Sequence, residues 1–181
     1  YAHNLYLNGT LITELAIPDG VTSIGDSAFR GCSSLTSITI PDSVTSIGWE
    51  AFSGCNNIQF ATMPTLAIGY ISKSSLKTVV LTGGTSIGSS AFEDCRSLTS
   101  ITIPDGVTSI GSSAFSGCSS LTSITIPDGV TSIGSSAFRG CSSLTSITFN
   151  GTKAQWNAIS KGYNWTLNTG NYTVHCTDGD I

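Results

Sequence analysis

Residues 98–120 read LTSITIPDGVTSIGSSAFSGCSS, and residues 121–143 repeat this string with Ser116 replaced by Arg139. The two tandem copies set a period of 23 residues. A fixed period of about 20–50 residues marks a solenoid, in which each unit contacts only its neighbours along one axis. Because one unit cannot bury its own apolar side, stacked units must share a continuous core. The duplication therefore predicts a repeat solenoid.

Four further segments follow the same register. Residues 12–34 and 35–57 are full-length copies, and residues 76–97 are one residue shorter. Residues 58–75 form a unit of 18 residues that lacks the Ala-Phe and Cys positions, which puts its regular stacking in doubt. The sequence thus predicts an N-terminal partial repeat over residues 1–11, a solenoid of six repeats and the strand of a seventh over residues 12–149, and a C-terminal cap over residues 150–181.

Each copy predicts the same local structure, as residues 121–143 illustrate. Residues 123–126 alternate polar and apolar side chains, which is the period of a half-buried strand. Residues 127–129, Pro-Asp-Gly, predict a turn, and residues 130–133 supply a second short apolar pair. Residues 135–138, Ser-Ser-Ala-Phe, predict a helical or 3₁₀ turn. We therefore expect an α/β repeat solenoid with short parallel strands and about 23 residues per repeat.

Stacking the copies aligns equivalent side chains in columns. The aromatic column contains Phe29, Phe52, Phe92, Phe115 and Phe138, and the cysteine column contains Cys32, Cys55, Cys95, Cys118 and Cys141. We expect the column cysteines to be free and buried, because free Cys packs as a small hydrophobe. Neighbouring Cα atoms about 5 Å apart would permit disulfides, but parallel Cβ vectors disfavour them. Cys176 lies outside the column, and the sequence assigns it no role.

The composition argues against several classes of function. Charged residues make up 10% of the chain, well under the usual quarter or so, so we expect a surface of Ser, Thr, Gly and Asn. A net charge of −4 without a basic stripe argues against nucleic acid. No apolar run is long enough to insert in a membrane. The chain begins at Tyr1 without Met, so we expect a piece of a longer protein.

Catalytic and metal sites are not expected. The histidines, His3 and His175, lie near opposite ends of the sequence, and no Gly-x-Ser-x-Gly elbow occurs, so serine has no evident base. No Cys-x-x-Cys spacing suggests zinc. A column of aspartates could suggest calcium, but turn formation explains each member. Its members are Asp19, Asp42, Asp105 and Asp128. We therefore predict a protein that is not an enzyme and that needs no cofactor.

The repeated pattern L-x-x-I-x-I-P-x-x-V-x-x-I-G-x-x-A-F-x-x-C resembles the BspA-like branch of bacterial leucine-rich repeat proteins, which also occurs in some parasitic protists. The resemblance covers residues 12–149, and the segment that starts at Thr152 resembles the closing segment of such proteins from gut bacteria. It implies a right-handed leucine-rich repeat solenoid that is secreted or lies at the cell surface. It also implies adhesion to host matrix proteins or to other cells, and it offers no catalytic residues.

The C-terminal segment has its own pattern. Residues 152–160 predict a helix with Trp156 and Ile159 on one face, and a strand-like stretch follows from Trp165 to Val174. A solenoid needs its last apolar face covered, so we interpret this segment as a cap. The alternative is a platform of aromatic rings for carbohydrate.

The outward strand positions are the natural binding surface. In most repeats they carry uniform Ser and Thr, but the third and fourth repeats place Gln59, Phe60, Lys77, Thr78 and Val80 there. An exposed aromatic ring beside a cation is typical of an interface anchor, whereas sequence drift or packing beside the short unit would explain the change without a function. We predict a monomeric adhesion or recognition scaffold that binds a protein partner. Alternatives are a spacer that projects other domains and, more remotely, ice binding by the Ser and Thr rows.

Overall fold

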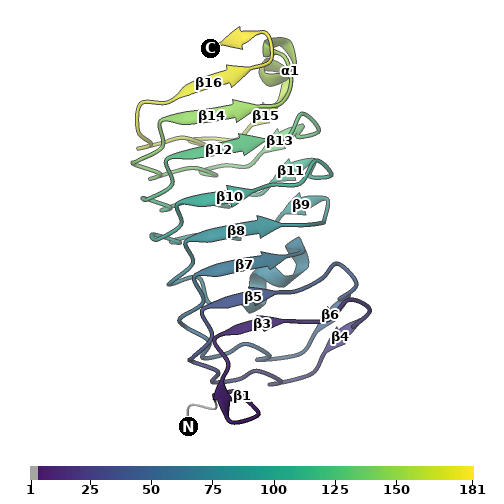
Figure 1. Ribbon diagram of the computed structural model, residues 1–181. Coiled ribbons are helices and arrows are strands. Elements are labelled where there is room, and N and C mark those ends of the chain that lie inside the picture. The colour runs from purple at the N-terminus through teal and green to yellow at the C-terminus, as the bar shows by residue number, and fades with distance from the viewer. Residues whose placement is uncertain (1–3) are drawn as a thin grey trace.

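The computed structural model describes residues 4–181, which form an elongated stack of coils (Figure 1). One long face carries a parallel strand from each coil, and we call it the strand face. Its strands are β3 (Glu14–Ala16), β5 (Ser37–Thr39), β7 (Phe60–Met63), β8 (Thr78–Leu81), β10 (Ser100–Thr102), β12 (Ser123–Ile126), β14 (Ser146–Phe149) and β16 (Thr173–Cys176). They pair in the order β3-β5-β7-β8-β10 and, further along, β12-β14-β16. The predicted strands are therefore confirmed.

A second ladder runs along another side of the stack. It consists of two-residue parallel strands that correspond to the second apolar pair of each repeat. Near the N-terminus, β4 (Ser23–Ile24) pairs with β6 (Ser46–Ile47). A separate sheet joins β9 (Ser86–Ile87), β11 (Ser109–Ile110), β13 (Ser132–Ile133) and β15 (Ser160–Lys161).

The third side of each coil consists of turns, and the prediction of a helical or 3₁₀ turn at Ser-Ser-Ala-Phe is met only in part. The Ser116 N–H donates to the Ser113 carbonyl at 3.0 Å, as in a 3₁₀ turn, but the turn does not continue into a helix. Ser113 has φ of 55°, a left-handed conformation that an α-helix does not admit. The Ser113 N–H donates to the Ser135 carbonyl (2.9 Å), and the Phe115 N–H donates to the Ala137 carbonyl (2.7 Å). These amides therefore bond to the next coil rather than within a helix. The fold is a leucine-rich repeat β-solenoid of about seven coils. It contains little helix, so the predicted α/β class is supported only loosely.

The core runs through the middle of the coils and contains the predicted aromatic column. The Phe92 and Phe115 rings stack with centroids 5.4 Å apart, and the Phe115 and Phe138 rings stack at 5.2 Å. In the first coils, Phe29 and Phe52 form a separate stacked pair at 5.2 Å. The column is therefore confirmed in two segments, which the short coil separates.

The five column cysteines are buried, as predicted, and all six cysteines of the chain are free thiols. The Cys118 Sγ donates to the Phe92 carbonyl at 3.1 Å, and the Cys55 Sγ donates to the Phe29 carbonyl at 3.0 Å. Each of these thiols thus links its coil to the preceding one. Burial raises the pKa of the Cys55 thiol to about 11, so the thiol stays protonated near neutral pH.

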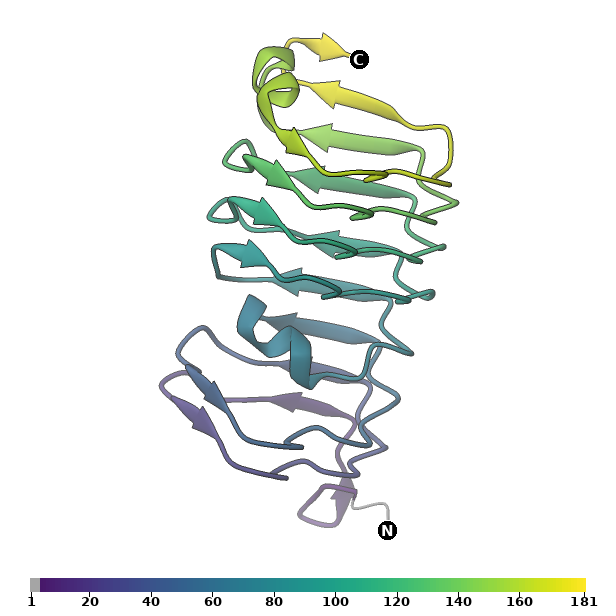
Figure 2. The same cartoon turned by 180° about the vertical axis from the view of Figure 1, so that it is seen from behind.

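The short unit over residues 58–75 joins only part of the stack. Its strand β7 pairs with β5 and β8, so the strand face passes through it without a break. Pro64 and Gly69 are separated by two residues fewer than Pro41 and Gly48 in the preceding coil. In this shorter span the chain winds into the 3₁₀ helix η1 (Thr65–Tyr70) instead of a second strand. Figure 2 shows η1 between β6 and β9, where the second ladder is interrupted.

One glycine position of the repeat lies directly against the preceding coil in some coils and not in others. A Cβ added to Gly111 would lie 2.6 Å from the Ser89 backbone nitrogen, closer than real Cβ contacts allow. The equivalent Gly88 follows η1 and has nothing within 4 Å of its added Cβ. The same repeat position is therefore sterically required in one coil and open in another.

The N-terminal segment forms a hairpin of its own. The strands β1 (Tyr6–Leu7) and β2 (Thr10–Leu11) pair antiparallel around Asn8 and Gly9, which both have positive φ. The Ile12 N–H donates to the Leu5 carbonyl at 2.8 Å, which joins the hairpin to the first coil. Tyr6–Leu7 lies in the predicted N-terminal partial repeat, and it thus forms a hairpin rather than a strand of the parallel ladder.

The C-terminal segment continues the coil beyond the point where the repeat pattern stops. Helix α1 (Lys153–Ala158) begins at Thr152 with a capping box to Gln155, which confirms the predicted helix. Strand β15 then joins the second ladder, β16 joins the strand face, and β17 (Gly179–Asp180) folds back on β16. The backbone of residues 150–176 therefore follows the same path as the repeats.

Aromatic side chains close the core at this end. The Trp165 ring packs edge-on against Phe138 at 6.2 Å and against Trp156 at 6.0 Å. Trp156 and Ile159 are both buried, as the predicted shared face requires. These rings therefore cover the end of the aromatic column, which argues against the alternative of a carbohydrate platform at Trp156.

Candidate ligand-binding surface

The strand face carries two outward rows of side chains, and the third and fourth coils interrupt both. In the first row, Phe60 pairs with Ser37 on one side and Thr78 on the other. In the second row, Val80 pairs with Thr62 and Thr102. Phe60 is 49% exposed and Val80 is 36% exposed, so both present apolar surface to solvent. The structure thus places these two residues on adjacent strands of one open face.

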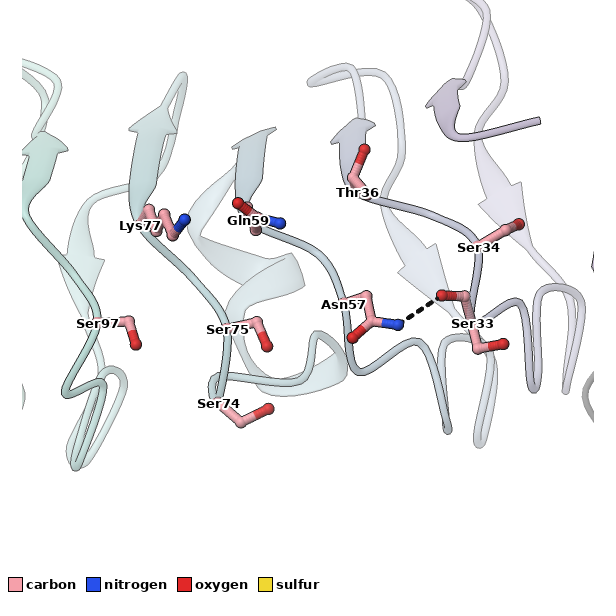
Figure 3. Close-up of a pocket in the computed structure, with 9 residues that line it drawn as sticks. All are labelled: Ser33, Ser34, Thr36, Asn57, Gln59, Ser74, Ser75, Lys77 and Ser97. Carbon is pink, nitrogen blue, oxygen red and sulfur yellow. Dashed lines mark hydrogen bonds between the residues drawn. The ribbon is translucent and has the colours of Figure 1, made fainter. Parts of the chain in front are cut away.

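Gln59 and Lys77 line an open groove beside this patch, at the edge where the chain enters the strand face (Figure 3). We call it the polar groove, and its volume is about 480 Å³. It crosses four successive passes of the chain. The lining residues are Ser33, Ser34, Thr36, Asn57, Gln59, Ser74, Ser75, Lys77 and Ser97.

Part of the lining of the polar groove is held by bonds to the backbone. The Asn57 Nδ2 donates to the Ser33 carbonyl at 2.8 Å, and the Ser75 Oγ donates to the Asn56 carbonyl at 2.7 Å. The Ser34 Oγ donates to the Ile12 carbonyl at 2.8 Å. These bonds fix the side chains in place and leave their oxygens with lone pairs that can still accept hydrogen bonds.

Three other side chains of the polar groove have no such partner. Within residues 4–181, the Gln59 amide, the Lys77 ammonium and the Ser97 hydroxyl make no hydrogen bond to protein. The groove lining contains no carboxylate, and Lys77 forms no ion pair in the described part of the chain. These groups can therefore bond to a ligand without breaking a contact.

The short coil is the physical origin of the polar groove. The Ser74-Ser75 turn belongs to the 18-residue unit, which lies between the longer units over residues 35–57 and 76–97 (Figure 3). Because this unit lacks the Ala-Phe turn and the Cys position, less chain is available to fill the side that leads into β8 (Thr78–Leu81). The departure from the repeat pattern thus creates a hollow.

The structure brings the five predicted site residues to one region but divides them between two surfaces. Gln59 and Lys77 face the polar groove, whereas Phe60, Thr78 and Val80 belong to the strand face. Sequence reasoning missed the other groove residues. One signal for the groove was available in the sequence, since Asn57 replaces the second serine of the repeated Cys-Ser-Ser motif.

The other candidate sites offer less evidence of ligand binding. The Asp42 Oδ1 accepts a hydrogen bond from the Thr82 Oγ1 at 2.6 Å, which ties this member of the aspartate column to the coil that follows the short one. No group of three or more potential metal ligands occurs between residues 4 and 181. The His175 Nδ1 lies 2.8 Å from the Asp180 Oδ1, and His3 lies outside the described residues. No helix of the described chain is long and apolar enough to cross a bilayer.

Coils that each add one short parallel strand to a shared face, with leucine and other aliphatic side chains in the core, define the leucine-rich repeat class of protein. The sequence matches the family model for the BspA type leucine rich repeat region (6 copies) over residues 2–82 and 70–164. The chain therefore belongs to the BspA-type leucine-rich repeat family, which confirms the resemblance. Such repeat proteins are non-enzymatic scaffolds with extended surfaces for protein interaction.

Two solved structures are similar to this chain in sequence and in fold. A leucine-rich cell-surface protein from Faecalibacterium prausnitzii is 40% identical over 82% of this chain and 35% of that chain, with a TM-score of 0.54. A leucine-rich repeat protein from Bacteroides ovatus is 25% identical over 92% of this chain and 56% of that chain, with a TM-score of 0.56. This chain thus spans about a third and about half of their lengths. No curated protein matches it.

Proposed function

We propose that this chain is part of a cell-surface or secreted recognition scaffold, which adheres to host matrix proteins or to cells through the third and fourth coils. The observation that carries the proposal is the half-exposed Phe60 ring on a face that is otherwise rich in Ser and Thr. Aromatic anchors contribute most of the binding energy at interfaces, and small hydroxyl side chains contribute little. The Phe60–Val80 pair therefore supplies the apolar centre of the contact.

The polar groove supplies the rim of the proposed contact. Lys77 and Gln59 lie beside the apolar pair and offer unpaired donors. A polar rim around a small apolar centre is the usual anatomy of an interface between proteins. The cell-surface location of the Faecalibacterium relative supports the same location for this protein.

The test is the double variant Phe60→Ser with Lys77→Thr, which restores the residue types of the neighbouring coils. We expect this variant to lose at least tenfold in binding to a panel of immobilised extracellular-matrix proteins and to cells, because it removes both the aromatic anchor and the cation. Circular dichroism should show an unchanged fold, since both side chains are exposed.

The matched control is Thr122→Ala, which removes a hydroxyl at the repeat position of Lys77 in a regular coil. We expect the control to bind as the parent does. If the control loses binding while the double variant keeps it, the repetitive rows are the working surface and the proposed patch is wrong.

A further inference from the structure

The polar groove has the chemistry of a site for a ligand rich in hydroxyl groups. Its walls are hydroxyls and amides from four passes of the chain, and no apolar side chain lines it. Hydroxyl and amide groups both donate and accept hydrogen bonds, so they suit a partner that also does both. An apolar peptide side chain would find no matching wall in this groove.

The single cation restricts the ligand further. Lys77 is the one charged side chain in the lining, and it lies among neutral donors and acceptors. One ammonium matches one carboxylate, and such a charge-assisted bond is about twice as strong as a neutral one. A polyphosphate chain would require several cations, which the groove lacks.

The dimensions and the rim fit a short sugar chain. Four parallel passes about 4.8 Å apart extend over roughly 14 Å, which suits an oligosaccharide of two or three units. Phe60 directly follows Gln59 and exposes half of its ring on the adjoining face. An exposed aromatic ring offers a flat apolar surface on which the carbon face of a sugar can stack.

From these observations we infer that the polar groove binds an acidic oligosaccharide, with Lys77 on the sugar carboxylate, Gln59 and Ser97 on its hydroxyls and Phe60 against a neighbouring ring. The inference rests on the proposed function, because it names the ligand chemistry of that same surface. The partner is then a glycoprotein or a polysaccharide that carries sialic acid or a uronic acid.

The test titrates the chain with 3′-sialyllactose, which carries a sialic acid, and with a hyaluronan tetrasaccharide, which carries uronic acids. Lactose, which is 3′-sialyllactose without its acidic sugar, is the neutral control. We expect amide resonances of Gln59, Lys77 and Ser97 to shift with the acidic sugars, and lactose to bind about tenfold more weakly. A response to one acidic sugar alone identifies the kind of acid. Equal affinity for lactose and both acidic sugars would overturn the inference.

Two variants separate the groove from the general charge of the chain. Lys77→Thr should weaken binding of the acidic sugar about tenfold and leave binding of lactose unchanged. Arg139→Ser removes the same charge from an exposed position of a regular coil and restores the Ser116 type, so it should bind as the parent does. Equal loss in both variants would show a non-specific charge effect and contradict the assignment.

A last comparison distinguishes failure of the inference from failure of the proposed function. Matrix proteins are immobilised before and after enzymatic removal of their glycans and sialic acids. Binding that disappears with the glycans supports the inference. If the parent binds the stripped proteins unchanged and no acidic sugar, the inference is wrong and the proposed function stands. If it binds neither the proteins, the cells nor the sugars, the proposed function fails as well.

Discussion

The regular coils over residues 76–149 and the short coil over residues 58–75 solve the same packing problem in different ways. Each regular coil contacts its neighbour through the strand face, the second ladder and a row of turn amides. The short coil keeps the strand face but replaces the second strand with η1. The regular coils are thus held to their neighbours on all three sides, whereas the short coil lacks the second ladder.

The comparison shows which contacts a repeat can lose. Ala61, Met63 and Ile68 of the short coil remain buried, so the core continues through it. The hydrogen bonds of the second ladder do not continue. Burial and strand-face pairing together carry the stack through the short coil, and the second ladder is the contact that this coil lacks.

The largest expected effect concerns the aromatic column. Phe115→Ala should lower the free energy of unfolding by about 3–5 kcal/mol, as large-to-small core substitutions do. Phe52→Ala should cost less by about 0.5–1.5 kcal/mol, because Phe52 stacks on one ring and Phe115 on two. Denaturant unfolding of both variants checks the difference. Equal losses would show that stacking across coils adds nothing to burial.

The next effect separates two glycines of the same repeat position. Gly111→Ala should destabilise by about 1–3 kcal/mol, because its methyl group meets the Ser89 backbone. Gly88→Ala should be neutral or slightly stabilising, because its added Cβ has open space. Thermal unfolding of the pair provides the measurement. Similar losses of stability in both variants would mean that η1 does not leave free space beside Gly88.

The third prediction concerns alkaline pH. The pKa of the Cys55 thiol rises from an ordinary 9.0 to about 11 in the folded chain, so the native state holds its proton more tightly than the unfolded state. The stability from this thiol is complete below pH 9 and is lost as pH rises through 11. Denaturant unfolding between pH 8 and pH 11 should show this decline, with a shallower slope for Cys55→Ala. The same slope in both proteins would contradict the buried thiol.

The smallest effect concerns the open edge beside η1. The Lys73 Nζ donates to the Ser90 carbonyl at 2.8 Å, in the coil that lacks a regular preceding neighbour. Lys73→Met should cost about 1 kcal/mol, since the half-buried carbonyl loses a charged donor. Lys77→Met on the exposed face should stay within about 0.5 kcal/mol. A reversed order in chemical denaturation would show that Lys73 does not support this edge.

The sequence predicted the parts of the fold that depend on local pattern. Alternation located the strands, and the columns of Phe and Cys followed from the period. The turn at Ser113 was predicted as helical because Ser-Ser-Ala-Phe suits a helix, but its amides bond to the next coil, which no local pattern reveals. The polar groove depends on the length of one coil and on side chains from four passes, so only Gln59 and Lys77 could be predicted.

The interrupted second ladder gives the molecule a mechanical axis. Between β6 and β9 the second ladder has no hydrogen bonds, so the strand face is the only continuous ladder that resists bending there. A load that bends the stack therefore concentrates its strain at residues 58–75, while the regular coils on either side rotate as rigid blocks. The polar groove crosses this same axis. We therefore expect tension along the stack to change the width of the groove before it unfolds any coil.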